Sequence, residues 1–350
     1  MQVTTIGIDL GKHVFQVHGV DAKGKAVLRK RLRRGQVLPF FANIAPCLIG
    51  MEACGSAHHW ARELMALGHE VKLMPPSYVK AYVKRGKNDA ADAEATCEAV
   101  RRPSMRFVPV KSAEQQSVLM LHRSRDLLIR QRTMLVNALR AHLAELGIIA
   151  PQGITNVSRL AAIVANDGDE RIPPLARRAL SAILTQLREL GSRIKEVETE
   201  IVAWHRGNEA SRRLATIPGV GPITASAIAA TVTAPSAFCS GRHFAAWLGL
   251  VPRQNSSAGK DRLGGISKAG DRYIRRLLVI GATTVIRYAR TKAAVDSEWI
   301  RQLLDRRPPR VASVALANKT ARIAWAILTH GGVYCPAPAR GLIRGGRPLP

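Results

Sequence analysis

Short apolar runs separated by turn residues fill the first hundred positions, and this pattern predicts a β-rich α/β domain. Residues 3–12, VTTIGIDLGK, form a β-branched apolar run that delivers Asp9 to the end of a strand and turns at Gly11. Residues 13–20 and 26–32 also have strand character, and the intervening DAKG segment predicts a turn between them. The three segments together predict an antiparallel meander, which suits a ribonuclease-H-like sheet.

The next segments alternate between strand and helix. Residues 46–52, PCLIGME, predict a strand that ends in Glu52, and residues 57–67 and 70–74 predict a helix and a further strand. Residues 34–44 suggest a short helix interrupted by Pro39, and Ser77 can cap a helix through Val83. Asn88 can cap a helix over 89–100, which places Asp89 and Asp92 on one face of that helix.

A longer helical period begins after residue 105. Residues 112–146 predict one long helix that starts with a capping box of Ser112 and Gln115, and residues 175–205 predict a second. The pair suits either a coiled-coil arm with a dimer contact or a helical hairpin packed on the sheet, and the pattern leaves both open. We therefore expect an α/β domain at 1–105, a helical arm at 106–206, a mostly helical domain at 207–335 and a flexible tail at 336–350.

Charge narrows the choice of partner. The chain of 350 residues has 53 Lys and Arg against 25 Asp and Glu, for a net charge of +28, and the excess is largest in residues 216–350. Such a field favours a polyanion, because each phosphate contact releases counterions. No face of Trp, Phe and Leu opposes a lysine face as in a basic membrane binder, and no apolar run approaches a membrane span. Five scattered cysteines without a C-x-x-C pair argue against zinc and disulfides and favour a reducing cytoplasm.

Four acids form the first candidate site. Asp9 and Glu52 end strands expected to be neighbours, and Asp89 and Asp92 share a helix face. Each alone also fits a surface strand end or a solvated helix start. As a set they provide the hard oxygen ligands with which two magnesium ions clamp a phosphodiester. The phosphate-binding turn of the actin and sugar-kinase fold is a rival for residues 7–12, but the second Asp-Gly-Gly loop of that fold is missing from the sequence.

Two segments of the cationic last third are candidates for DNA contact. Residues 217–230, IPGVGPITASAIAA, predict a helix-hairpin-helix whose turn, with Gly219 and Gly221, can bind a backbone phosphate, although a tight helix corner uses the same glycines. Residues 247–276 predict a flexible, exposed loop of Ser, Gly, Lys and Arg that leads into a helix over 271–290. A serine among arginines can attack phosphorus or merely touch phosphate, and the residue pattern alone does not decide between these.

Most of the chain resembles the DEDD transposases of bacterial insertion sequences, the IS110 family, which are related to the Piv-type DNA invertases. The motifs are GIDLGKHVFQVHGVD, LIGMEACGSAHHWA and KRGKNDAADAEA in the first part, then LATIPGVGPITASAIAA, FAAWLGLVPRQNSSAGK and GGISKAGDRYIRRLL. QNSSAGK is most similar to the IS1111 subgroup. The resemblance implies a RuvC-like first domain in which Mg²⁺ or Mn²⁺ is bound by Asp9, Glu52, Asp89 and Asp92. It also implies a serine nucleophile, which ungapped counting places at Ser257 rather than Ser256.

The resemblance further implies an enzyme that cuts and exchanges DNA strands, guided by a structured bridge-type RNA from the non-coding end of its own element. It implies a homodimer or homotetramer, in the cytoplasm and on the nucleoid when active. Two alternatives remain: a RuvC-type endonuclease without a covalent intermediate, and a non-catalytic nucleic-acid-binding protein. The residues expected to contact nucleic acid are Gly219, Gly221, Arg253, Lys260, Arg262, Lys268, Arg275 and Arg276.

Overall fold

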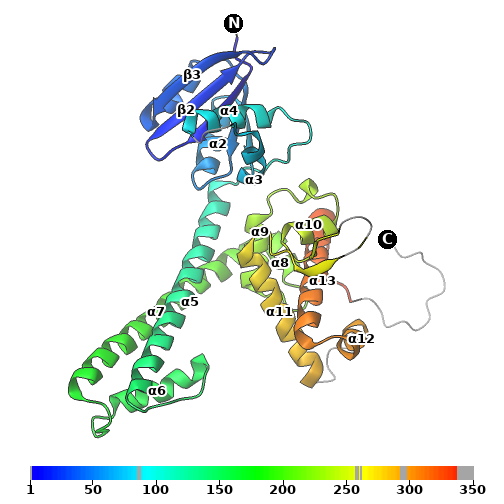
Figure 1. The fold of residues 1–350 in the computed structure, drawn as a ribbon. Helices are drawn as coiled ribbons and strands as arrows, with labels where there is room; N and C mark the ends of the chain where they lie inside the picture. Colours follow the sequence, from blue (N-terminus) through cyan, green and yellow to red (C-terminus); the bar gives the residue numbers. More distant parts are fainter. Residues whose placement is uncertain (1, 85–87, 257–259, 261, 292–297, 337–350) are drawn as a thin grey trace, which may run out of the picture. The chain divides into compact units, whose positions relative to one another are not determined.

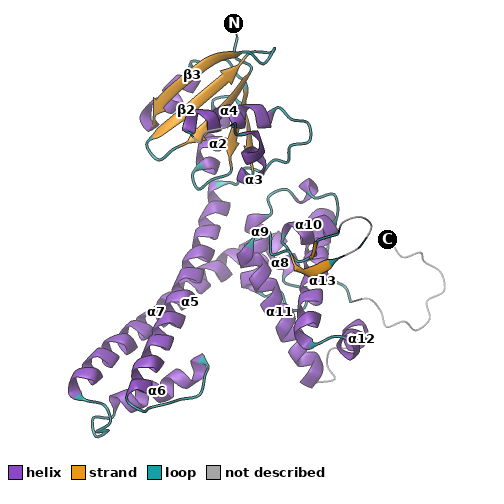
Figure 2. Ribbon diagram, viewed as in Figure 1, coloured by secondary structure: helices purple, strands orange, loops and turns teal. Residues whose placement is uncertain are grey.

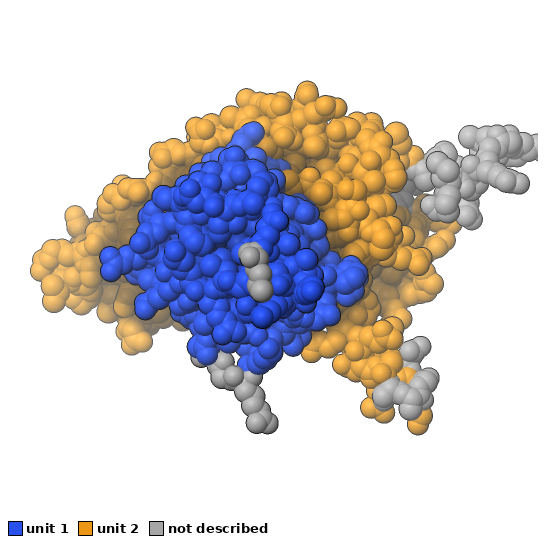
Figure 3. Space-filling view, turned by 90° about the horizontal axis from the view of Figure 1, so that it is seen from above, with its two compact units in different colours: residues 1–117 blue, residues 118–350 orange. Residues whose placement is uncertain are grey.

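The computed structural model describes residues 2–84, 88–256, 260, 262–291 and 298–336. It divides into two units, residues 1–117 and 118–350, which Figure 3 shows in different colours. The predicted flexible tail lies outside the described residues except for residue 336. Within the described ranges, no helix is long and apolar enough to cross a membrane.

The first unit combines a five-stranded sheet with short helices (Figures 1 and 2). Its elements are β1 (Thr5–Leu10), β2 (Val14–Val20), β3 (Ala26–Arg33), η1 (Arg34–Gln36), α1 (Val37–Ala42), β4 (Leu48–Glu52), α2 (Ala57–Ala66), β5 (Glu70–Met74), α3 (Pro76–Val79), η2 (Lys80–Tyr82) and α4 (Asp89–Val100).

The sheet is mixed, with the strand order β3-β2-β1-β4-β5. β1, β2 and β3 form the expected antiparallel meander, whereas β1, β4 and β5 run parallel. Ile6 and Ile8 of β1 are buried in one core with Trp60 and Leu64 of α2. Residues alternate across a strand, so Gly7 and Asp9 lie on the opposite face, where α4 packs.

Two local predictions for this unit are wrong. α1 continues through Pro39 without interruption, because Pro39 is the third helical residue. The N–H groups of the first helical turn make no hydrogen bond within the helix, so a proline there removes none. Ser77 does not cap a helix: α3 begins at Pro76 with Pro75 in the cap position, where no side chain makes a capping hydrogen bond. Asn88 does cap α4, since its Oδ1 accepts a hydrogen bond from the Ala91 amide at 2.8 Å.

Two long helices, α5 (Ala113–Glu145) and α7 (Pro174–Gly207), confirm the predicted helical pair, and α5 starts with the predicted capping box of Ser112 and Gln115. Each is about 50 Å long at 1.5 Å per residue. Within the second unit, the last turns of α5 bury Leu139 and Leu143 against Leu160 of α6 (Val157–Ala165) and Leu180 of α7.

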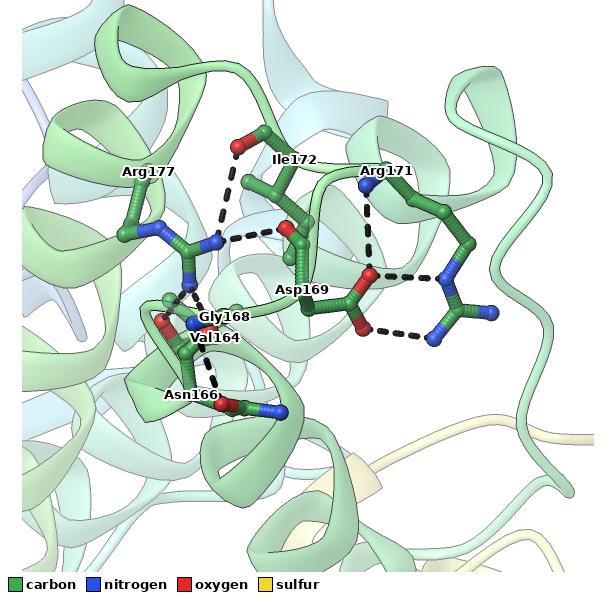
Figure 4. Close-up of polar contacts among 7 residues, drawn as sticks. All are labelled: Val164, Asn166, Gly168, Asp169, Arg171, Ile172 and Arg177. Carbon is green, nitrogen blue, oxygen red and sulfur yellow. Dashed lines mark hydrogen bonds and ion pairs between the residues drawn. The ribbon is translucent and has the colours of Figure 1, made fainter.

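The side chain of Arg177 makes several hydrogen bonds to backbone carbonyls in the connection between α6 and α7 (Figure 4). Arg177 Nη1 donates to the carbonyl oxygens of Val164 and Asn166 at 2.6 Å each, and its Nη2 donates to that of Asp169 at 2.8 Å. The last carbonyls of a helix have no partner within the helix, so the guanidinium satisfies them at the end of α6. Asp169 in turn holds Arg171 through a side-chain pair at 2.6 Å.

The remaining elements form the helical C-terminal part. They are α8 (Glu209–Leu214), α9 (Pro222–Thr231), η4 (Pro235–Ala237), α10 (Gly241–Trp247), β6 (Pro252–Gln254), β7 (Leu263–Ile266), α11 (Arg272–Thr291), α12 (Glu298–Arg306) and α13 (Pro309–His330), with η3 (Ile154–Asn156) preceding α6. Their core is formed by side chains such as Ile228, Phe244, Leu278 and Ala321.

The described parts of residues 247–276 include two paired strands, which corrects the prediction of a flexible loop there. β6 and β7 pair antiparallel, with Pro252 opposite Ile266 and Gln254 opposite Leu263. The Asn255 amide continues the ladder by donating to the Arg262 carbonyl at 2.9 Å. We call β6, β7 and residues 255–262 between them the serine hairpin. These strands cannot be recognised in the sequence, because they are only three and four residues long and exposed and therefore lack an alternation of apolar and polar residues.

Candidate functional site: an acid face and a serine hairpin

Two of the predicted acids, Asp9 and Glu52, stand on the face of the sheet that α4 covers, and Asp89 and Asp92 belong to the first turn of α4 itself. We call this face with the start of α4 the acid face. In the parallel pair of β1 and β4, Gly7 lies opposite Gly50. Asp9 and Glu52 each follow those glycines by two residues, so both side chains stand on the same face as the glycines. The acids therefore share one end of two adjacent strands, as the sequence predicted.

Close contact between the backbones of α4 and β1 positions Asp89 and Asp92 relative to Asp9. A Cβ on Gly7 would lie 2.2 Å from the Ala93 carbonyl oxygen and 2.3 Å from the Cys97 amide nitrogen, so α4 rests directly on β1. A Cβ on Gly50 would lie 2.7 Å from the Val100 side chain. Asp89 and Asp92 occupy the first turn of this helix, ahead of its contact with Gly7.

The electrostatics show that the acids interact. Burial raises the pKa of Asp9 from 3.8 to about 6, and repulsion from Asp89 and Asp92 adds to this shift. Burial also raises the pKa of Glu52, with contributions from the charges of Asp9 and Asp92. Such mutual repulsion would be relieved by a cation, and carboxylate oxygens suit a hard divalent ion. Among the described residues, however, no group of three or more His, Cys, Asp or Glu side chains is arranged to hold a metal ion.

Ser257, the predicted nucleophile, lies outside the described residues, whereas its neighbour Ser256 lies within them. The Ser256 hydroxyl accepts a hydrogen bond from the Arg262 amide at 3.2 Å, so it helps to close the serine hairpin. The side chains of Arg253, Lys260, Arg262 and Lys268 are all exposed in or next to this segment.

Two predicted DNA contacts have partners inside the protein. Arg275 Nη1 donates to the carbonyls of Leu248 at 2.8 Å and Ala269 at 2.6 Å. Arg276 pairs with Asp126 of α5, and its guanidinium lies 5.3 Å from the Tyr273 ring centroid. Both side chains therefore tie the start of α11 to its surroundings.

The turn before α9 also has a packing role. Gly219 has a φ of +82°, and a Cβ there would lie 2.8 Å from the Gly281 carbonyl oxygen in α11. Glycine is needed at this position for both its backbone conformation and this close approach. Gly219 and Gly221 remain exposed.

Two cationic surfaces were absent from the sequence predictions. The first is β3, an edge strand with exposed Arg29, Lys30, Arg31 and Arg33, which the RKRLR run could have indicated. The second consists of Arg310, Lys319 and Arg322 of α13, which line one hollow. Lys319 and Arg322 lie about one helical turn apart, and Arg310 lies about two and a half turns before Lys319.

Comparison with known proteins decides the family. The model described as "Transposase IS116/IS110/IS902 family" matches residues 211–296, and a DEDD model of the IS110 group, described as "Transposase", matches residues 6–148. A Pseudomonas aeruginosa protein named "Probable family 20 transposase" is 50% identical over 337 residues, covering 96% of this chain and 100% of the relative. The chain belongs to the IS110 family of insertion-sequence transposases.

Two other relatives support the subgroup. The transposase for insertion sequence element IS1328 of Yersinia enterocolitica is 43% identical, covering 95% of this chain and 98% of the relative. The transposase for insertion sequence element IS1111A of Coxiella burnetii is 39% identical, covering 95% of this chain and 91% of the relative. The protein is thus an IS110-family transposase, an enzyme that catalyses DNA strand transfer, and its DEDD domain implies dependence on a divalent metal.

Proposed function

We propose that this transposase is an RNA-guided, site-specific recombinase in which Ser257 forms a phosphoserine with the cut DNA strand. The single observation that best supports the serine step is the hydrogen bond that engages the Ser256 hydroxyl. The Ser256 hydroxyl is engaged by the Arg262 amide, and the adjoining Ser257 is the other hydroxyl of the segment. In the proposed step the Ser257 oxygen bonds to phosphorus as the bond from phosphorus to the 3′ or 5′ oxygen of the neighbouring nucleotide breaks, and the serine proton is balanced by protonation of that leaving oxygen. A second strand's hydroxyl later attacks the same phosphorus, which breaks the bond to Ser257 and returns the proton to the serine oxygen.

The acid face has the complementary role in this proposal. Its strand order, β3-β2-β1-β4-β5, supports a ribonuclease-H-like, RuvC-like domain. Asp9, Glu52, Asp89 and Asp92 would hold Mg²⁺ or Mn²⁺, which would supply Lewis-acid stabilisation of charge on phosphate oxygens and lower the pKa of a nucleophile. Burial raises the pKa of Asp9, and repulsion from Asp89 and Asp92 adds to this shift, which a bound cation would offset.

The proposed DNA and RNA contacts follow the charge. Arg253, Lys260 and Arg262 belong to the serine hairpin, Lys268 follows it, and the turn at Gly219 and Gly221 is exposed. Cations that approach phosphates release counterions whatever the base sequence, so they suit both donor and target DNA. The separate cationic edge at β3 offers a second polyanion surface, which suits the proposed bridge-type RNA.

An apolar stripe on α5 supports the proposed oligomer and the role of this region as an arm. Met120, Leu127 and Met134 recur every seven residues and are 58%, 48% and 69% exposed. A seven-residue apolar repeat is the seam of a coiled coil, so the stripe suits a second copy of the chain. Leu127→Lys with Met134→Lys should shift the sedimentation of the full chain toward the monomer. Thr133→Lys should not, because this exposed position lies about 100° around the helix from Met134.

The decisive experiment traps the covalent intermediate. The full chain is incubated with its guide RNA, Mg²⁺ and a suicide DNA substrate, then digested, and the phosphorylated peptide is located by mass spectrometry. We expect the adduct on Ser257, its loss with retained DNA binding in Ser257→Ala, and only a mild effect of Ser256→Ala. Metal-dependent cleavage without an adduct would favour the endonuclease, and salt-sensitive binding without cleavage would favour a passive binding protein.

A further inference from the structure

An open hollow of about 990 Å³ lies beside the serine hairpin in the second unit. We call it the α13 hollow, because most of its lining residues belong to that helix. The other walls are Leu250 and Pro252 at the start of the hairpin, Gly264, Gly265 and Ile266 of β7, and Trp299 of α12. Pockets for small organic ligands typically measure ~300–1,000 Å³, so a single nucleotide fits this space.

The interior of the α13 hollow is largely apolar. Val311, Val314, Ile323 and Ala326 supply aliphatic side chains from α13. β7 contributes two glycines, and a Cβ on Gly265 would meet no atom within 4 Å. Val311 is 50% exposed although it is apolar. Exposed apolar surface of this kind is typical of a binding site whose ligand has an apolar part.

The charged residues of the hollow are all cations. Arg310, Lys319 and Arg322 line it, and its lining includes no Asp or Glu. In the part of the chain that the structure describes, none of the three forms an ion pair with a carboxylate. Lys319 Nζ lies 4.3 Å from the Trp299 ring centroid, and burial together with the Arg322 charge lowers the pKa of Lys319. An anion would relieve this concentration of positive charge.

An unpaired nucleotide combines these properties, since its base is flat and apolar on both faces and its phosphate is anionic. We propose that the α13 hollow binds one unstacked DNA base of the substrate strand, with the adjoining phosphates on Arg310, Lys319 and Arg322. The proposal rests on the proposed function only in taking DNA as the substrate. β7 is a strand of the serine hairpin and also lines the hollow. A base bound in the hollow would therefore lie close to the segment that carries the serines.

Binding of two single strands to the full-length protein tests this without catalysis. One is oligothymidylate, and the other is an abasic strand of equal length with the same phosphates but no bases. A stacked base contributes enough that the wild type should bind oligothymidylate roughly tenfold more tightly than the abasic strand. Ala315→Trp, which fills the hollow, should abolish this preference and leave affinity for the abasic strand unchanged. Equal affinities in the wild type, or an unaltered preference in Ala315→Trp, would overturn the proposal.

Three further comparisons sharpen the test. Val311→Asn, at an exposed position, should reduce the preference even if the larger substitution perturbs folding. Arg310→Gln with Arg322→Gln should weaken binding of both strands more than Arg287→Gln with Arg290→Gln, which removes equal charge from exposed positions outside the hollow. If oligouridylate shows the hollow-dependent preference and oligothymidylate does not, the DNA assignment is wrong. Since no step of the assay needs Ser257, failure of the serine proposal would leave these outcomes readable.

Discussion

The acid face and the serine hairpin are built in opposite ways. On the acid face, backbone meets backbone: a Cβ on Gly7 would come within 2.2 Å of the Ala93 carbonyl oxygen, so any shift of α4 moves Asp89 and Asp92. In the serine hairpin, two short exposed strands flank residues 255–262, and a Cβ on Gly265 would meet nothing within 4 Å. Close packing holds α4 against β1, whereas the two strands of the serine hairpin are exposed.

The largest expected effect comes from the acids. Asp89→Asn with Asp92→Asn should abolish strand exchange and leave folding nearly intact, because neither side chain is part of the core. Removing two negative charges should also leave DNA binding intact or tighten it. Recombination of a donor and a target plasmid measures the first, and filter binding the second. Full recombination by the double variant would contradict the role of the acid face.

The same variant should alter the titration of Asp9. Loss of the Asp89 and Asp92 charges should lower the pKa of Asp9 from about 6, although burial, the largest cause of the shift, keeps it above 3.8. Carboxyl chemical shifts measured against pH report this. An unchanged pKa of Asp9 would mean that the α4 acids lie too far away to share its site.

The next effect tests the close packing. Gly7→Val should destabilise the protein by ~3 kcal/mol or more, because its side chain must push α4 off β1. Gly55→Ala is the matched control, since a Cβ there meets no atom within 4 Å. Urea unfolding of the full chain measures both. Similar stability of the two variants would show that α4 can move without cost.

Much of this architecture follows from the sequence, and the exceptions have physical causes. The acids were predictable because each stands at a pattern boundary: Asp9 and Glu52 end apolar strands, and Asn88 starts the helix of Asp89 and Asp92. The hairpin strands were missed because exposed strands of three or four residues have no apolar alternation. The α13 hollow was missed because only tertiary packing brings Trp299 and Gly265 near Lys319.

The second unit also contains a buried histidine, His122, whereas the strands of its serine hairpin are exposed. His122 of α5 lies 3.1 Å from both the Tyr273 hydroxyl and the Ser226 hydroxyl, and burial lowers its pKa from 6.5 to about 4. The folded protein therefore holds the neutral ring, while the unfolded chain takes up a proton below pH 6.5. The stability contributed is complete above pH 6.5 and is lost as the pH falls toward 4.

The low pKa of His122 predicts that the stability of the protein depends on pH, and that substitution of His122 removes this part of the dependence. From pH 7 to pH 4 the His122 contribution should fall by on the order of 2–3 kcal/mol. In His122→Gln, which retains hydrogen-bonding capacity without titrating, that part of the slope should vanish. Urea unfolding across this range compares the two proteins, and identical slopes would place the protonated ring of His122 in the folded state.

The smallest expected effect compares the cations of the serine hairpin with those of β3. Arg253→Gln with Arg262→Gln should reduce the salt slope of DNA binding by roughly 0.7–0.9 for each phosphate that the variant no longer neutralises. Arg29→Gln with Arg31→Gln removes equal charge from β3 and should change DNA binding less, because the last third of the chain has the greater positive excess. Equal changes would assign DNA contact to both surfaces.

The central claim is that the acid face and the serine hairpin serve one reaction. The most direct test is the yield of the Ser257 phosphopeptide on the suicide substrate, compared between the wild type and Asp89→Asn with Asp92→Asn. We predict an adduct in the wild type and none in the double variant, although both bind the DNA. An adduct at wild-type yield in the double variant would show that the serine acts without the acids and contradict the claim.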